Sequence, residues 1–391
     1  MKRNISLLTL VFLALGILSG LFVKPLVTSL SFIGSIYINL LKFLIAPIVF
    51  SSIVPTIFHS SKKKDDTLQT AVITYMAMFV ATFLLTSLAV TLLDPAKGFS
   101  FPAQDWNGNV QSLSVQEIIV NLFPNNLVSI FAETKLFAII LFAYMLGICA
   151  GKVEKGEKLI EGIEILRDIF FRILEYVMYL TPLAVFSLIG NTIANYGVVI
   201  IGVGLKYIAA AYLCGILTII FVMMLPVWLI AKIPPIEYLK KVYKVWLVSL
   251  TTCSSAATLP TTMKVCVEEF GVSKRIVDIV SPLGCTIHMC GGAVSFALLG
   301  LFCSKMYGVE ISAGTYILMC VFALLINMSA PGIPNGGVVI GATYLSLLGI
   351  PLDFIGFYSG IYKILDMLYT TLNVTGNITA NVILSRVKKG I

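Results

Sequence analysis

Long apolar stretches dominate this sequence, and they constrain its fold more than any other feature. A helix needs about 20 predominantly apolar residues to cross the hydrocarbon core of a bilayer. Such stretches lie at residues 6–27, 31–58, 68–93, 129–151, 165–192, 198–231, 275–303 and 353–384. Only 12% of the residues are charged, whereas soluble domains average about 25%. The pattern predicts an all-α membrane protein with eight transmembrane helices in contact with lipid.

Basic residues predict how these helices are oriented. The formal net charge of +8 is by itself compatible with nucleic-acid binding. However, the lysines and arginines form short clusters between the apolar stretches, at residues 2–3, 62–64, 152–158, 240–244 and 386–389. Cytoplasmic loops of membrane proteins have this excess of basic residues. We therefore expect an integral protein of the plasma (inner) membrane with both termini in the cytoplasm, and no nucleic-acid partner.

The cysteines do not indicate a metal centre or a disulfide framework. The chain has 8 of them, mostly inside apolar stretches, and no two have the CxxC spacing typical of zinc sites. Reduced cysteines pack like small apolar side chains. We expect no metal and no cofactor apart from a coupling ion.

Two further apolar segments are interrupted by small and polar residues. Residues 243–267 contain TTCSSAATLP at 251–260, and residues 315–348 contain NMSAPGIPNGG at 327–337. A short loop between two ordinary spans is one interpretation, but the first half of the earlier segment is too short to cross a bilayer at about 1.5 Å per residue. A re-entrant helical hairpin fits better. Two such opposed hairpins indicate a substrate site near the membrane midplane of a transporter.

Several motifs resemble those of one transporter family. They lie at residues 41–51 (LKFLIAPIVFS), 254–263 (SSAATLPTTM), 282–291 (PLGCTIHMCG), 330–334 (APGIP) and 365–377 (LDMLYTTLNVTGN). The chain is similar in these motifs, and in their order, to the dicarboxylate/amino acid:cation symporter family, which includes glutamate and neutral amino acid transporters.

The resemblance implies an architecture and a mechanism. It implies a homotrimer with an inverted-repeat, elevator-type fold, in which a mobile transport domain slides along a fixed scaffold. Residues 1–66 and 129–195 would form scaffold helices, and residues 67–128 a transport-domain helix with an outside loop. Residues 196–391 would form the transport core, with hairpin 1 at about 235–270 and hairpin 2 at about 310–350.

Asp366 is the clearest candidate for a substrate contact. Ionisable side chains inside apolar segments are costly and usually functional. The resemblance implies that this carboxylate binds the α-ammonium group of an amino acid, although an ion pair with Lys363 one turn earlier is the structural alternative. The resemblance places the other substrate contacts at Ser254, Ser255, Met289, Ile333, Gly337, Tyr369, Thr370 and Asn373.

Two replacements predict the substrate class. Family members that transport acidic substrates have an arginine in the last helix or at the first hairpin tip, where this chain has Tyr369 and Cys253. A second substrate carboxylate would be buried there without a partner. We therefore expect a neutral or non-acidic amino acid. Lys363 is an alternative counter-charge if it faces the site, and a sodium-coupled symporter of acidic amino acids or C4-dicarboxylates is then the alternative function.

Further replacements concern the coupling ion. The resemblance assigns ion coupling to Gly284, Thr286, His288, Cys290, Asn373 and Asn377. Sodium-coupled members have carboxylates at two of these positions and a Thr-Ser pair in the third span, where this chain retains Tyr75 but has Met78 and Phe79. We expect two of the family's three sodium sites to be lost. The third depends on backbone carbonyls, so the side chains do not decide whether this chain retains it.

His288 has two interpretations. Because histidine titrates near neutral pH, it could carry a proton through the transport cycle, or it could be a neutral hydrogen-bond donor. Our hypothesis is proton coupling or sodium-independent exchange.

Two other functional classes fit less well. An ion channel needs rings of charges or carbonyls along a pore, and a single buried carboxylate beside broken helices is more typical of a closed site. An intramembrane enzyme could use Ser254 or Ser255 with His288 and Asp366 as a triad, but no nucleophile-elbow or HExxH motif is present. We expect a transporter, not an enzyme.

Overall fold

The computed structural model describes residues 2–62, 66–99, 126–132, 136–197, 199–327 and 336–387. Most of the expected outside loop and the tip of hairpin 2 lie outside these ranges. The described residues form helices and short turns without a β-strand, which confirms the all-α class. The helices are α1 (Lys2–Phe22), α2 (Lys24–Ser29), α3 (Ser31–Lys62), α4 (Asp66–Leu93), α6 (Leu127–Ala132), α7 (Leu136–Ala150), α8 (Gly156–Tyr179), α9 (Thr181–Tyr196), α10 (Val199–Thr218), the π-helical turns η1 (Ile219–Met224) and η2 (Val227–Ala231), α11 (Pro235–Thr252), α12 (Ser255–Glu268), α13 (Lys274–Ile287), α14 (Cys290–Met306), α15 (Ala313–Asn327), α16 (Gly336–Leu347) and α17 (Asp353–Val387).

Several helices have the length and apolarity of membrane spans. Among the described residues, four helical stretches qualify, namely Lys24–His59, Gln69–Leu93, Ile201–Ala231 and Lys274–Met306. The bent pair formed by α8 and α9 raises the number to five. Several apolar helices are expected of an integral membrane protein. The count of eight spans stays a prediction.

The prediction that residues 165–192 form a single helix, the fifth expected span, is wrong. The structure has two helices, α8 and α9, bent by 55° at Leu180. Pro182 lies in the first turn of α9, where its missing N–H and fixed φ favour the start of a new helix. The apolar residues on both sides of this proline conceal the break in a hydropathy pattern.

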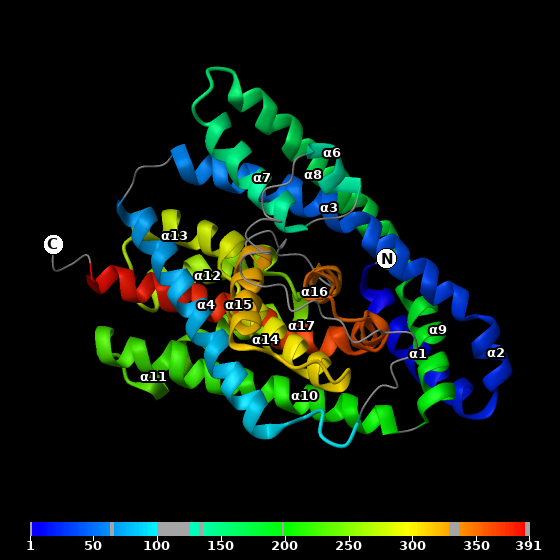
Figure 1. Ribbon diagram of the computed structural model, residues 1–391. Helices are drawn as coiled ribbons and strands as arrows, with labels where there is room; N and C mark the ends of the chain where they lie inside the picture. Colours follow the sequence, from blue (N-terminus) through cyan, green and yellow to red (C-terminus); the bar gives the residue numbers. More distant parts are fainter. Residues whose placement is uncertain are drawn as a thin grey trace.

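Helix α17 lies at the centre of the fold. Its 35 residues are mostly buried, and it contacts α10, α11, α12, α13, α14 and α16. Figure 1 shows α17 in orange and red, with α10 and α11 along one side and α14 and α15 beside it. Because protein rather than lipid surrounds α17, it can contain many Thr and Asn side chains.

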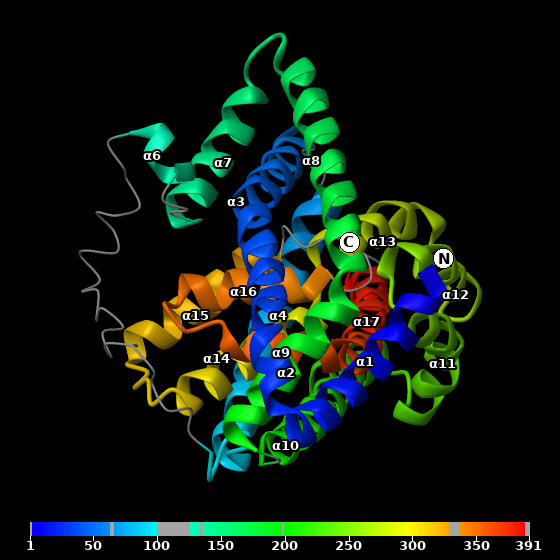
Figure 2. The same cartoon turned by 90° about the vertical axis from the view of Figure 1, so that its right-hand side faces the viewer.

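A second group of helices packs around α3 and α9, whereas α4 packs against α14, α10, α13 and α17. Helix α1 packs along α9, and α3 packs against α7, α8 and α9. The approach of α1 to α9 is very close, since a Cβ on Gly20 would lie 2.6 Å from the Gly190 carbonyl oxygen. Figure 2 shows α7 and α8 extending beyond the rest of the chain, away from α17.

Helices α11 and α12 form an antiparallel hairpin. The Tyr238 ring, near the start of α11, lies 5.8 Å from the Phe270 ring just after α12. An ion pair between Lys244 and Glu269 also joins the two helices. The helix ends at Thr252 and begins again at Ser255, inside the interrupted stretch expected at residues 251–260.

Helices α15 and α16 form a second contacting pair. They pack together, and the Tyr344 hydroxyl donates a hydrogen bond of 3.3 Å to the Met319 carbonyl oxygen. Both pairs direct one end toward the middle of α17, where polar side chains gather.

Candidate functional site

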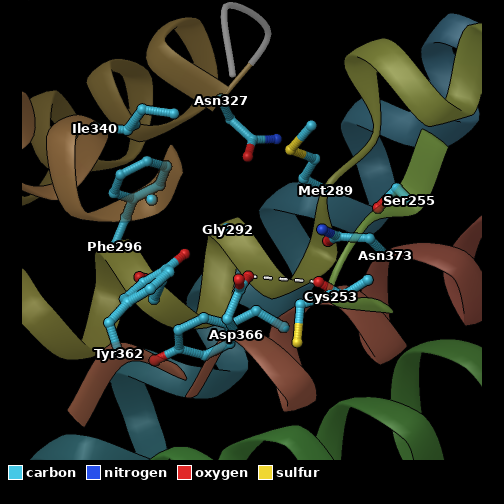
Figure 3. A pocket seen from close by; sticks show the side chains of 14 residues that line it. Cys253, Ser255, Met289, Gly292, Phe296, Asn327, Ile340, Tyr362, Asp366 and Asn373 are labelled. Atoms are coloured by element: carbon cyan, nitrogen blue, oxygen red, sulfur yellow. Dashed lines mark hydrogen bonds between the residues drawn. The ribbon is translucent and has the colours of Figure 1, made fainter. Parts of the chain in front are cut away.

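A pocket lies where the two helix pairs meet α14 and α17. Its lining residues come from the end of α11 and the start of α12, from α14, from the facing ends of α15 and α16, and from α17. These residues are Cys253, Ser255, Met289, Gly292, Ser295, Phe296, Asn327, Gly337, Ile340, Tyr362, Asp366, Tyr369, Thr370 and Asn373. Figure 3 shows their side chains converging from both sides on Asp366. Seven of the nine expected substrate contacts therefore lie together.

Asp366 provides the charge of this pocket. Among the described lining residues, it is the one with an acidic or basic side chain, and it is only 6% exposed. Thr370, one turn later on α17, donates a hydrogen bond of 3.4 Å to Asp366 Oδ1 (Figure 3). A buried carboxylate in this setting favours a cationic ligand group, because a charge-assisted bond offsets the loss of hydration.

The tip between α11 and α12 forms one wall. Cys253 has a left-handed backbone, with φ of 49°, and Ser254 caps α12 by accepting a hydrogen bond of 3.2 Å from the Ala257 amide. Ser254 is therefore used in capping and does not line the pocket. Ser255 does line it, at the first turn of α12. The positive end of the α12 dipole thus faces the pocket and favours an anionic ligand group.

Asn373 forms another part of the wall. Its Oδ1 atom accepts a hydrogen bond of 2.8 Å from the Gly291 amide at the start of α14. Because the oxygen is already used, Asn373 offers its NH2 group to a ligand. A carboxylate placed between Ser255 and Asn373 would receive donors from both.

The wall opposite is formed by α15 and α16. Gly337 packs directly against Tyr362, since a Cβ on Gly337 would lie 1.7 Å from the Tyr362 hydroxyl. The amide nitrogen of Asn327 is buried and has no hydrogen-bond partner within the described ranges. Ile333, the remaining expected contact, lies outside the described residues.

Most expected ion-coupling residues form a second polar cluster, beside the pocket. Asn377 is its centre. Its Oδ1 atom lies 2.9 Å from the Tyr75 hydroxyl and accepts a bond of 3.0 Å from Asn381 Nδ2. Its own Nδ2 donates to the Ser281 carbonyl oxygen at 2.8 Å. Gly284 makes this packing possible, because a Cβ there would lie 2.2 Å from the Tyr75 hydroxyl. Thr286 lies near the end of α13.

His288 and Cys290 complete this cluster at the break between α13 and α14. His288 Nε2 lies 3.3 Å from the Cys290 thiol, which also receives a hydrogen bond of 3.6 Å from Thr82. Neither residue lines the pocket. Met78 and Phe79, which stand where the resemblance expects hydroxyl groups, are buried. In the described part of the chain no three His, Cys, Asp or Glu side chains gather as metal ligands.

Some lining residues were not expected from the sequence. They are Gly292, Ser295, Phe296, Asn327, Ile340 and Tyr362. Tyr362 precedes Asp366 by four residues, so the helical period of α17 places both on one face. Helical spacing likewise relates Gly292 to Ser295 and Phe296. Asn327 and Ile340 come from other segments, and only the tertiary fold brings them here.

A family model and several known proteins match this sequence over nearly its whole length. The family model described as the sodium:dicarboxylate symporter family matches residues 5–387. The proton/glutamate-aspartate symporter of Bacillus subtilis is 26% identical over 399 residues, covering 100% of this chain and 96% of the relative. The proton/sodium-glutamate symport protein of Geobacillus stearothermophilus is 28% identical, covering 98% and 95%. The C4-dicarboxylate transport protein of Bacillus subtilis is 24% identical, covering 98% and 93%.

Proposed function

This chain belongs to the sodium:dicarboxylate symporter family, and we propose that it is a secondary transporter of a neutral or non-acidic amino acid. The observation that carries this proposal is the charge content of the pocket. Asp366 suits an α-ammonium group, and Ser255 and Asn373 suit an α-carboxylate. These groups together bind the part that all amino acids share, and they leave the substrate side chain to the remaining walls.

Apart from Asp366, the described residues that line the pocket are uncharged. Tyr369 and Cys253 both line the pocket, and neither supplies a positive charge. Lys363 is half-buried and is not among the described lining residues. A second substrate carboxylate would thus be desolvated without a direct partner, which is strongly unfavourable. This supports a substrate without an acidic side chain.

The polar cluster around Asn377 supports sodium independence at that position. Sodium needs oxygen atoms with free lone pairs, but Asn377 Oδ1 already accepts a hydrogen bond from Asn381 Nδ2 and shares the Tyr75 hydroxyl proton with the Val280 carbonyl oxygen. The Asn377 amide also donates a hydrogen bond to the Ser281 carbonyl oxygen, so a donor of the protein occupies this oxygen as well. Donors of the protein therefore replace the cation. We propose that a proton, held near His288, or no ion at all, is coupled to transport.

The other expectations complete the proposal. Residues 1–66 and 129–195 form a scaffold for a homotrimer in the inner membrane, and the segments 67–128 and 196–391 form a domain that moves as an elevator. The packing of α1–α3 with α7–α9 as one group, which meets the helices around α17 at α9 and α3, supports this division. The opposed re-entrant hairpins and the cytoplasmic termini belong to the same proposal.

A symporter of acidic amino acids or C4-dicarboxylates is the second candidate. The relatives named above are glutamate, aspartate or C4-dicarboxylate transporters, and Lys363 precedes Asp366 by one helical turn of α17. Isothermal titration calorimetry of purified protein separates the two candidates. Serine, alanine or threonine should release heat on binding, whereas aspartate, glutamate and succinate should not. Tight binding of the acids alone would favour the second candidate.

Flux measurements test the coupling. In liposomes, uptake of the bound amino acid should respond to a pH gradient and ignore a sodium gradient. Uptake that strictly requires sodium would overturn this part of the proposal.

A further inference from the structure

The side chain of Asn327, at the end of α15, is a polar group of the pocket to which the proposed function gives no role. The residue lines the pocket and is only 1% exposed. Its Nδ2 atom is buried and has no hydrogen-bond partner among the described residues. Buried N–H groups nearly always have a partner in folded proteins. A ligand that enters this pocket is therefore a candidate partner for the Asn327 amide.

Gly292 on α14 determines where this amide lies. Helices α14 and α15 pack together, and a Cβ on Gly292 would lie 2.1 Å from Asn327 Oδ1. The carboxamide thus occupies the space that a side chain at position 292 would fill. The same Cβ would lie 3.5 Å from Met289 Cβ, and Met289 and Gly292 both line the pocket. Asn327 is therefore packed into the pocket wall against α14.

The Asn327 amide is the pocket's largest unused source of hydrogen-bond donors. Ser295, another polar lining residue, has its hydroxyl 2.8 Å from the Tyr358 hydroxyl. Among the described lining residues, only Asn327 and Tyr369 have a buried polar side-chain atom without a partner there. The Tyr369 hydroxyl can donate one hydrogen, whereas the Asn327 amide can donate two. Asn327 is thus the stronger candidate for a polar contact with the substrate.

The position of Asn327 in the pocket indicates which part of a substrate it contacts. Figure 3 shows Asn327 across the pocket from Asp366. Asp366 suits an α-ammonium group, and Ser255 and Asn373 suit an α-carboxylate. The groups that all amino acids share are therefore assigned to other residues. The wall that contains Asn327 is left for the substituent on the α-carbon, which is the substrate side chain.

A carboxamide selects its partner because it presents a donor and an acceptor side by side. A hydroxyl group or a second carboxamide can satisfy both. A carboxylate can only accept hydrogen bonds, so it meets the Asn327 carbonyl oxygen unfavourably, and an alkyl group leaves the buried amide unpaired. Sites with buried polar groups discriminate strongly against analogues that leave these groups unpaired.

We propose that Asn327 is a specificity-determining residue that hydrogen-bonds the substrate side chain, so that the protein prefers amino acids with a neutral hydroxyl or carboxamide group. Serine, threonine, asparagine and glutamine belong to this class, whereas alanine and valine lack the polar group. This inference rests on the proposed function, because it takes Asp366, Ser255 and Asn373 as the contacts of the shared amino-acid groups. Gly292 is a positioning residue in this scheme, since its missing side chain leaves room for the amide.

The test compares pairs of amino acids that differ in one hydroxyl group. Isothermal titration calorimetry on purified full-length protein measures the affinities of serine and alanine, and of threonine and valine, which have nearly the same shape. We expect the hydroxyl amino acid of each pair to bind roughly tenfold more tightly, as one net hydrogen bond allows. Aspartate is titrated in parallel.

Asn327→Leu removes the hydrogen-bonding group at similar side-chain volume. We expect both affinity ratios to fall to about one, with most of the change in the affinity for the hydroxyl amino acids. Asn195→Leu makes the same substitution at an exposed position of α9 outside the pocket, and its ratios should equal those of the wild type. Gly292→Ala is an independent variant, because its methyl group would displace the Asn327 amide and lower the ratios.

The other outcomes separate the inference from the proposed function. Equal affinities within both pairs in the wild type overturn the inference alone, since neutral amino acids still bind. Equal losses for both members of a pair in Asn327→Leu overturn it too, because Asn327 then acts on the shared groups or on the fold. Binding of aspartate with all four neutral amino acids silent overturns the proposed function, and the inference with it.

Two further variants keep the test decisive. Ratios that persist in Asn327→Leu but vanish in Tyr369→Phe would assign the contact to the Tyr369 hydroxyl and overturn the inference. If Asn327→Leu does not fold, as judged by its thermal transition, Asn327→Ala gives the same comparison with a smaller side chain, and Gly292→Ala gives it with residue 327 unchanged.

Discussion

The imidazole ring of His288 stacks on the phenol ring of Tyr75, with centroids 4.5 Å apart and ring planes inclined by 22°. Its Nε2 atom contacts the Cys290 thiol, whereas its Nδ1 atom is buried without a hydrogen-bond partner among the described residues. The ring is therefore held in place while one nitrogen is available to a proton or a water molecule.

Replacing His288 with asparagine should remove the response of transport to a pH gradient. Asparagine retains a hydrogen-bonding group but does not titrate near neutral pH. The measurement is the ratio of serine uptake with and without an imposed gradient in liposomes. His59→Asn is the control, since His59 pairs with Glu164 on the surface between α3 and α8. A pH response that survives in His288→Asn would assign the proton to another group.

Asp366→Asn should weaken amino-acid binding by roughly 100-fold, because the substrate ammonium loses its charged partner. Calorimetry on purified protein measures this loss. Asp353→Asn makes the same chemical change at the exposed first turn of α17, and its affinity should equal that of the wild type. Equal affinities in both variants would mean that Asp366 is a structural residue.

Tyr369→Arg should create a site for an acidic side chain, because it adds the missing positive charge to the pocket wall. We expect measurable aspartate binding and weaker serine binding. Tyr369→Phe tests the loss of the hydroxyl alone and should not bind aspartate. If the arginine variant folds and still ignores aspartate, the substrate side chain does not point toward Tyr369.

Gly337→Ala should destabilise the contact between α16 and α17. The added methyl group would lie 1.7 Å from the Tyr362 hydroxyl, and overpacking of this kind typically costs about 1–3 kcal/mol. A lower thermal transition is expected, with partial recovery in the double variant Gly337→Ala/Tyr362→Phe. Gly202→Ala is the control, because a Cβ there meets nothing within 4 Å.

Asn377→Asp should make the stability of the protein depend on sodium. The change introduces a buried carboxylate between Tyr75 and Asn381 and removes the N–H groups that reach the Ser281 carbonyl. A bound cation would then stabilise the folded state in proportion to its concentration. Thermal transitions in sodium and in choline chloride should differ for Asn377→Asp and coincide for the wild type. A wild-type transition that rises with sodium alone would mean that an intact sodium site exists.

Local patterns allowed part of this fold and site to be predicted. Hydropathy located most of the long helices, and the small polar residues at 251–260 located the break at Cys253. Asp366, Tyr369, Thr370 and Asn373 share one face of a single helix, so any one of them helps to place the others. The same period would have found Tyr362. The bend at Leu180 was missed because apolar residues surround Pro182, although the proline itself was a usable signal.

The rest of the site depends on contacts between distant parts of the chain. Tyr75 and Asn377 are 302 residues apart, and only the packing of α4 against α13 and α17 brings them together. Ser254 shows a different limit. Its sequence position fits both a substrate contact and a helix cap, and the structure uses it as a cap. Residue identity alone does not separate these two roles.

The left-handed backbone of Cys253 has a consequence for how this protein can evolve. A side chain in that conformation is strained by roughly 1–2 kcal/mol relative to glycine, so Cys253→Gly should raise stability while it removes a thiol from the pocket wall. The residue best for the tip as a turn is thus different from the residue that forms this part of the pocket wall. A change at this single position would exchange a side chain of the substrate site for a more stable turn.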